Sequence, residues 1–156
     1  DMLREVSPHA AVVFLTNLPD PRFSDHGTDG LPSSVAYLRK TALSDVDSLV
    51  EALDAAMRGS DLRRHRHDQD SGRPLASLTQ KQIDVMLLAA EGKSNAQIAA
   101  DRNLSVKAVE DLLSRAASVL GVDAAQDGNV RVAAVRRFLE GIGAPALSEH
   151  DNRSSR

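Results

Sequence analysis

The side chains best suited to bind an anionic ligand lie close together between residues 93 and 115. Lysine and arginine neutralise phosphates, hydroxyl and amide groups donate hydrogen bonds to phosphate oxygens, and a carboxylate accepts from cytosine. The candidate contacts with nucleic acid are Lys93, Ser94, Asn95, Ser105, Lys107, Asp111, Ser114 and Arg115. Within residues 103–116, NLSVKAVEDLLSRA, two cations stand against two anions, so the stretch has no net charge. Any nucleic-acid contact made there needs support from neighbouring elements.

Two helices with a tight connection are predicted to position these side chains. Ser94 begins a capping-box pattern before a short helix, and Ser105 is the expected N-cap of a longer helix that ends at Gly121. Asn103-Leu104 joins them, which predicts a helix-turn-helix whose second helix fits the major groove. Helical spacing predicts a buried stripe of Val109, Leu112, Leu113, Ala116 and Leu120. The predicted outward face carries Lys107, Asp111, Ser114, Arg115 and Ser118.

Each of these residues also has a purely structural interpretation. Ser94 and Ser105 are expected to cap helices whether or not they contact phosphate. Asp111 and Arg115 are four residues apart, a spacing that suits an ion pair on a solvated helix face. Capping and pairing therefore remain an alternative to DNA contact for the same side chains.

Two further helical patterns flank the pair. SLTQKQIDVMLLAAEG has Thr79 as N-cap, Gln82 completing a capping box, and Leu78 and Ile83 placed as a hydrophobic staple. GNVRVAAVRRFLEGIG predicts a last helix that starts near Asn129 and stops at Gly141. Residues 76–143 are thus predicted to form an all-α four-helix domain.

The same segment resembles a known family. LT-x₃-I-x-V-x₂-LAAEGKSNAQIA, then LS-x₃-V and LGV, resemble in one register the LuxR-type (NarL/FixJ) helix-turn-helix domain, over about residues 76–142. The resemblance implies a four-helix domain that binds double-stranded DNA as a homodimer, with the fourth helix at the dimer contact. Val132, Val135 and Leu139 are the candidate dimer residues, although an internal core role suits them equally.

The chain departs from that family in the recognition helix. The family commonly has Thr-Val-Lys-x-His, with a further Lys before Leu-Gly, whereas the variable positions here are Ala108, Glu110, Leu112 and Val119. A hydroxyl, an imidazole and two ammonium groups are missing, and phosphate contacts supply much of the affinity for DNA. A degenerate helix-turn-helix that serves as a protein-interaction or dimerisation module is therefore the alternative function.

Residues 1–59 are predicted to be the end of an α/β domain. HAAVVFLT (9–16) reads as a buried, parallel strand, VAYLRK (35–40) as a second strand, and residues 44–59 as an amphipathic helix with Ser44 as N-cap. This half-sheet resembles the last two strands and last helix of a response-regulator receiver. The resemblance places Thr16 at the switch hydroxyl, Tyr37 near the switch aromatic and Lys40 at the phosphate-contacting lysine. It implies a histidine kinase as partner of the full-length protein.

The remaining segments are polar. Residues 60–75, including RRHRH, read as an exposed linker, and residues 144–156 as a disordered tail. Residues 1–57 carry four basic and nine acidic residues, and residues 76–147 carry eight of each sign, so no domain is strongly basic. The chain opens with Asp1 rather than Met, and we expect an internal fragment.

Composition limits the remaining possibilities. The absence of cysteine excludes disulfides, thiolate metal sites and cysteine nucleophiles, and fits a cytoplasmic protein. No apolar run approaches the roughly 20 residues of a membrane span. No catalytic triad or phosphate-loop signature is present, so we expect no enzymatic activity, no cofactor and no bound metal.

Overall fold

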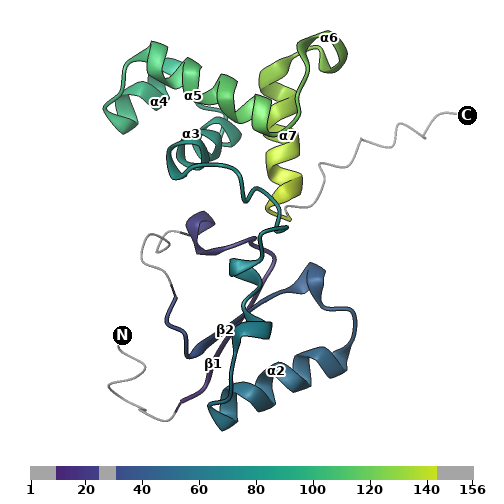
Figure 1. Ribbon diagram of the computed structural model, residues 1–156. Coiled ribbons are helices and arrows are strands. Elements are labelled where there is room, and N and C mark those ends of the chain that lie inside the picture. Colours follow the sequence, from purple (N-terminus) through teal and green to yellow (C-terminus); the bar gives the residue numbers. More distant parts are fainter. Residues whose placement is uncertain (1–9, 25–30, 144–156) are drawn as a thin grey trace, which may run out of the picture. The chain divides into compact units, whose positions relative to one another are not determined.

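The computed structural model describes residues 10–24 and 31–143, which belong to two compact units, Asp1–Ala76 and Ser77–Arg156 (Figure 1). These residues form six α-helices and two short parallel strands, with 3₁₀ turns between them. The predicted tail at 144–156 and the first residue of the predicted strand at 9–16 lie outside the described residues.

The first unit is built on the predicted parallel strand pair. β1 (Val12–Thr16) and β2 (Val35–Arg39) pair in register from Val12 opposite Val35 to Thr16 opposite Arg39. β2 is buried, but the prediction that β1 is a buried strand is wrong, because Phe14 and Leu15 are 44% and 43% exposed. In the part of the chain that the structure describes, β2 is the only strand beside β1, so one edge of β1 has no neighbour.

α2 (Val46–Arg58) follows the strands as predicted and ends at Gly59, whose φ of 63° is the left-handed conformation that glycine tolerates. The prediction of Ser44 as its N-cap is wrong. Asp45 caps the helix, because its carboxylate accepts from both the amide and the hydroxyl of Ser48 at 2.8 and 2.7 Å. Ala52 is the buried residue of this helix, and most of its apolar face is exposed, including Val46, Val50, Leu53 and Met57.

The segment after α2 is not the exposed linker that its composition predicts. Two 3₁₀ turns, Arg63–His65 and His67–Gln69, pack on β2, and Leu62, Arg66 and Asp68 are buried. Arg66 forms a parallel bridge with Tyr37, so this segment covers the outer edge of β2. Polar side chains are buried there because each is paired, as the ion pair of Arg66 with Asp68 at 2.8 Å shows. The short turns Pro21–Phe23 and Lys40–Ala42 follow β1 and β2.

The second unit is helical, as predicted. It contains α3 (Gln80–Ala90), α4 (Asn95–Arg102), α5 (Val106–Val119) and α7 (Val130–Gly141). The predicted N-caps Thr79, Ser94, Ser105 and Asn129 all accept a backbone hydrogen bond in the first turn of their helices. A one-turn helix not predicted from the sequence, α6 (Ala124–Asp127), lies between α5 and α7. The core joins α3, α4 and α5 through Val85, Ala89, Ile98, Ala99 and Val109.

Candidate nucleic-acid interface

The turn between α4 and α5 has the geometry of a helix-turn-helix. α4 stops at Asn103, which adopts a left-handed conformation with φ of 53°, one that asparagine tolerates better than most residues. The Leu104 amide then donates to the carbonyl of Ala99 at 2.9 Å, and Ser105 begins α5. Because the buried residues Ile98 and Val109 share one core, the two helices are held at a defined angle. The outer surface of α5 stays open to a ligand.

The two serine candidates are engaged as helix caps. Ser94 and Gln97 form a complete capping box, and the Ser105 hydroxyl oxygen accepts from the Ala108 amide at 3.0 Å. In each cap the hydroxyl acts as an acceptor, so its proton can still be donated to a phosphate oxygen. Capping and phosphate contact are therefore compatible at these two residues.

The outward face of α5 agrees with the helical spacing. Its exposed residues include all five that the sequence predicts, namely Lys107, Asp111, Ser114, Arg115 and Ser118. The expected ion pair of Asp111 with Arg115 is not the one formed. Asp111 instead lies 3.1 Å from Lys107 Nζ, and its hydrogen bond and charge raise the pKa of Lys107. Within residues 31–143 the structure records no polar partner for the Arg115 side chain, which makes it the free cation of this face.

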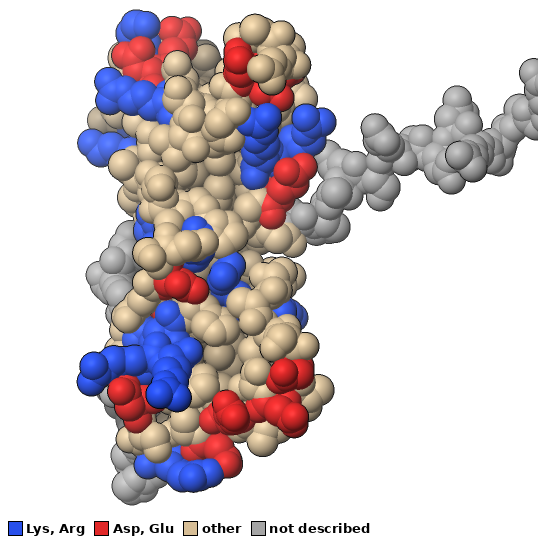
Figure 2. Space-filling model, turned by 45° about the vertical axis from the view of Figure 1, so that its right-hand side comes forward, with Lys and Arg blue, Asp and Glu red and all other residues tan. Residues whose placement is uncertain are grey.

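The cations beside α4 are also paired. Lys93 Nζ lies 2.7 Å from Asp101 and 3.4 Å from Glu91, and the hydrogen bond that Lys93 donates to Asp101 raises the Lys93 pKa. Arg102 pairs with Asp84 of α3. Figure 2 shows the same mixture on the visible face of the helical unit, where lysine and arginine lie beside aspartate and glutamate rather than in one basic patch. Local pairing reduces the field that the surface offers to phosphates.

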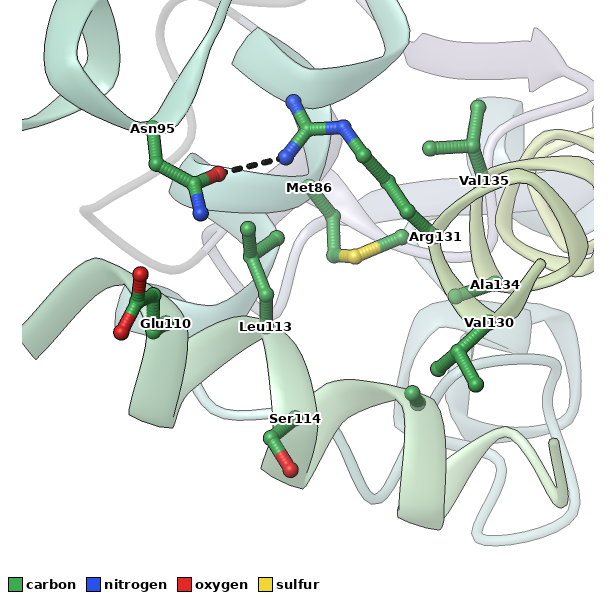
Figure 3. Close-up of a pocket in the computed structure, with 10 residues that line it drawn as sticks. Met86, Asn95, Glu110, Leu113, Ser114, Val130, Arg131, Ala134 and Val135 are labelled. Atoms are coloured by element: carbon green, nitrogen blue, oxygen red, sulfur yellow. Dashed lines mark hydrogen bonds between the residues drawn. The ribbon is translucent and has the colours of Figure 1, made fainter. Parts of the chain in front are cut away.

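Asn95 is held by a residue that sequence reasoning missed. Its Oδ1 accepts from Arg131 Nη1 of α7 at 2.6 Å (Figure 3). Arg131 Nη2 donates to the Lys93 carbonyl. Arg131 lies 36 residues from Asn95, so no local pattern indicates the contact.

Comparison with known proteins agrees with this geometry. Residues 76–127 match the model of the luxR family of bacterial regulatory proteins, a range that includes α3, α4 and α5. We refer to residues 76–143, which contain this match, as the LuxR-family domain. The chain is also similar to the transcriptional regulatory protein LiaR of Bacillus subtilis (strain 168), with 29% identity over 99 residues. That match covers 57% of this chain and 46% of the relative, so the chain spans about half the length of the curated relative that it matches. No solved structure matches the chain significantly.

In the LuxR-family domain, the three candidate dimer residues on α7 do not share one environment. Val132 is 63% exposed, whereas Val135 is partly buried and packs against the core of its own domain. Leu139 is also partly buried. Val132 is therefore the most exposed of the three candidate residues.

Outside the LuxR-family domain, two of the three candidate switch residues lie at the carboxyl ends of the paired strands, Thr16 as the last residue of β1 and Lys40 directly after β2, whereas Tyr37 is the middle residue of β2. Thr16 Oγ1 accepts from the Leu18 amide at 3.1 Å, and the buried Tyr37 donates its hydroxyl to the Leu18 carbonyl, also at 3.1 Å. Burial, with the nearby carboxylates of Asp20 and Asp68, raises the pKa of Tyr37. Lys40 follows β2 and is exposed. Thr16 and Tyr37 therefore meet at the same short loop.

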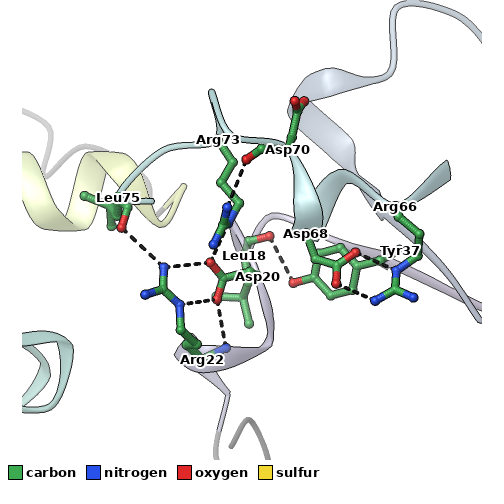
Figure 4. A network of polar contacts seen from close by, with 9 residues as sticks. All are labelled: Leu18, Asp20, Arg22, Tyr37, Arg66, Asp68, Asp70, Arg73 and Leu75. Carbon is green, nitrogen blue, oxygen red and sulfur yellow. Dashed lines mark hydrogen bonds and ion pairs between the residues drawn. The ribbon is translucent and has the colours of Figure 1, made fainter. Parts of the chain in front are cut away.

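A polar network that the sequence did not predict holds this loop (Figure 4). Asp20 is buried and accepts from Arg22 at 2.9 Å and from Arg73 at 2.7 Å. Burial raises the pKa of Asp20, but the hydrogen bonds from both arginines outweigh it and leave the pKa below its ordinary value. Arg73 belongs to the predicted linker, so the network ties that segment to the loop after β1.

One of the two histidines of RRHRH supports the end of β2. His67 Nδ1 accepts from the Arg39 amide at 3.0 Å, and burial together with the Arg39 charge lowers the pKa of His67. Across residues 10–24 and 31–143, no group of three or more histidine or carboxylate side chains is placed to hold a metal ion. None of the helices in those ranges is long and apolar enough to cross a membrane.

Proposed function

We propose that the LuxR-family domain binds double-stranded DNA, with α5 in the major groove, and that the protein is a transcription regulator. The observation that carries this proposal is the α4–α5 pair, in which both N-terminal caps and the shared core are intact while the outward face of α5 is polar. A helix needs that combination to be held rigidly against a duplex. The luxR-family match over residues 76–127 includes both helices.

The proposed contacts compensate for the missing cations. Arg115 is exposed and unpaired in the described range, so it is the proposed reader of guanine or holder of a phosphate. The amides at the start of α4, with Ser94 and Asn95, provide neutral donors to a second phosphate. Lys107, Ser105, Ser114 and Asp111 add contacts along α5, and Lys93 lies next to the α4 cap. A second copy of the domain, meeting the first through Val132 on α7, doubles this set.

We further propose that the first unit is the end of a receiver-like domain and that the protein acts in a two-component system in the cytoplasm. The parallel register of β1 and β2, with Thr16 and Lys40 at their ends, supports this assignment. So does α2, whose apolar residues are exposed where a complete domain has further elements to cover them. A histidine kinase is then the proposed partner of the longer protein, which acts as a phosphorylation-controlled regulator.

The test of DNA binding is fluorescence anisotropy of the whole chain on labelled random and promoter-derived duplexes, from about 50 to 200 mM salt. Each phosphate contact contributes roughly 0.9 to the slope of log affinity against log salt, or about 3.5-fold over that range. Arg115→Ala is expected to weaken binding and to flatten the slope. Arg63→Ala removes the same charge from an exposed side chain of the other unit and is the control.

Two outcomes decide the proposal. Salt-dependent binding that Arg115→Ala weakens and Arg63→Ala spares supports a DNA-reading α5. A folded chain that fails to bind any duplex at the lowest salt refutes it, and leaves protein interaction or dimerisation as the use of the retained fold.

A further inference from the structure

Arg131 joins two parts of the LuxR-family domain that are distant in sequence. It lies in the first turn of α7, and its side chain reaches the turn between α3 and α4. One guanidinium nitrogen donates to Asn95 Oδ1 at 2.6 Å (Figure 3), and another donates to the backbone carbonyl of Lys93. These two acceptors flank Ser94, the N-cap of α4. The planar guanidinium of Arg131 therefore binds the residues on both sides of the N-cap residue.

The contact also fixes which end of the Asn95 amide remains available to a ligand. A guanidinium has only donors, so the amide must present its oxygen to Arg131. The Nδ2 group, with its two protons, then points away from Arg131, as Figure 3 shows. A phosphate has only acceptor oxygens under ordinary conditions, so Nδ2, which Arg131 does not occupy, is the group that can bind it. Without Arg131 the amide is free to rotate by 180° and present the wrong atom.

The packing around Arg131 is loose, which makes its hydrogen bonds to Asn95 and Lys93 more important for the position of α7. A hollow of about 250 Å³ separates α5 from α7 at this point, and its lining includes Met86, Leu113, Ala134 and Arg131 itself. The small side chain of Ala134 leaves part of this space unfilled, so close packing does not fully hold the start of α7 against α5. Directional bonds from Arg131 supply positional restraint there that close packing would otherwise supply.

We propose that Arg131 is a positioning residue for DNA binding, which fixes the α3–α4 turn and orients the Asn95 amide so that Nδ2 donates to a phosphate. This inference rests on the proposed DNA-binding function. Arg131 acts through Asn95 and the turn, and its own guanidinium is occupied by them. Its contribution is thus distinct from the long-range attraction that any cation on α7 exerts.

The experiment compares Arg131→Ala with Arg136→Ala, a control on the same helix that removes the same charge from an exposed side chain. Both variants are made in the full chain, alone and combined with Asn95→Ala. Arg131→Ala is expected to weaken duplex binding at about 50 mM salt by roughly tenfold more than Arg136→Ala, about the share of one hydrogen bond to a charged group. In the Asn95→Ala background this excess is expected to vanish, because the amide that Arg131 orients is gone. An equal loss in both variants, or an excess that persists without Asn95, overturns the proposal.

A second readout needs no DNA and therefore separates this proposal from the proposed function. In nuclear magnetic resonance spectra of the free chain, the side-chain amide of Asn95 and the backbone amides of residues 94–97 are expected to shift in Arg131→Ala and to stay in place in Arg136→Ala. Arg131→Lys keeps the charge but loses the planar guanidinium with its paired donors. In this variant the amide signals are expected to return only partly to their wild-type positions. Unchanged signals in Arg131→Ala overturn the positioning role, whether or not the wild-type chain binds a duplex.

Discussion

Lys107 Nζ lies 3.1 Å from Asp111 Oδ1, one turn further along the outward face of α5. The ammonium group closest to the start of the proposed recognition helix is therefore partly neutralised before any phosphate approaches. Binding DNA requires Lys107 to exchange this carboxylate for a phosphate. Breaking the ion pair offsets part of the binding free energy that the new phosphate contact provides. The balance between these two partners governs how strongly α5 attracts a duplex.

Removing the competing carboxylate is expected to strengthen DNA binding. Asp111→Asn frees Lys107 and removes repulsion between the carboxylate and phosphates, so anisotropy should show affinity higher by about 3- to 10-fold at low salt. Glu140→Gln on α7 makes the same charge change at another exposed position and is the control. If both substitutions raise the affinity for DNA equally, the effect comes from net charge alone and not from breaking the Lys107–Asp111 ion pair. Weaker binding by Asp111→Asn would indicate that Asp111 itself contacts a base.

A cation at position 110 should recover a contact that this chain lacks. Glu110 is exposed on α5, at the position where the family resemblance expects lysine. Glu110→Lys is expected to raise affinity and to steepen the salt slope by about 0.9 for one new phosphate contact. Titrations at four salt concentrations measure the slope directly. An unchanged slope would place residue 110 away from the duplex and weaken the proposed docking of α5.

Arg73 is expected to stabilise the first unit through Asp20. Arg73→Ala leaves the buried carboxylate with Arg22 alone, and the loss of a hydrogen bond to a charged group costs about 1.5–3 kcal/mol. Amide hydrogen exchange at residues 35–39 and 66–70 should quicken accordingly, while exchange in α3 to α5 stays as in the wild type. Arg63→Ala is the control, since Arg63 is 88% exposed and its ion pair with Asp61 should contribute little. Unaltered exchange in Arg73→Ala would mean that the segment after α2 is held by Leu62 and Arg66 without it.

The first unit should lose stability in mild acid through His67. Its pKa is lowered from 6.5, so the folded state binds fewer protons than the unfolded state, and this contribution to stability is complete above about pH 6.5 and is lost as the pH falls. The charged and titratable groups around it are Arg39 on β2, Glu51 on α2, and Arg64, His65, Asp68 and Asp70 on its own segment. The pKa of Asp20 is lowered from 3.8, so its protonation reduces the stability of the fold only at lower pH than that of His67.

Hydrogen exchange of residues 35–39 at about pH 7.5 and 5.5, corrected for the intrinsic rates, measures this effect. Protection is expected to fall with pH in the wild type. His67→Gln, whose side-chain oxygen can still accept from the Arg39 amide, is expected to remove that fall. A wild-type chain that is equally protected at both values would show that His67 does not titrate in this interval.

The sequence alone determined α3, α4, α5 and α7 of the LuxR-family domain, the N-caps of these four helices and the outward face of α5. A cap such as Ser105 contacts an amide three residues away, and helical periodicity repeats every three to four residues, so both depend only on near neighbours in the chain. The parallel strand pair was predictable for the same reason, because short β-branched runs bounded by turn residues indicate strands.

Only the tertiary structure decided which side chains meet across the fold. Arg131 reaches Asn95 from 36 residues away and Arg73 reaches Asp20 from 53, and no local spacing specifies either pair. Burial was equally nonlocal: the polar segment after α2 is partly buried because its charges are paired on β2, while apolar residues of α2 such as Val50 stay exposed because no described element covers them. Composition records what a side chain prefers, but the packing of distant elements determines whether that preference is met.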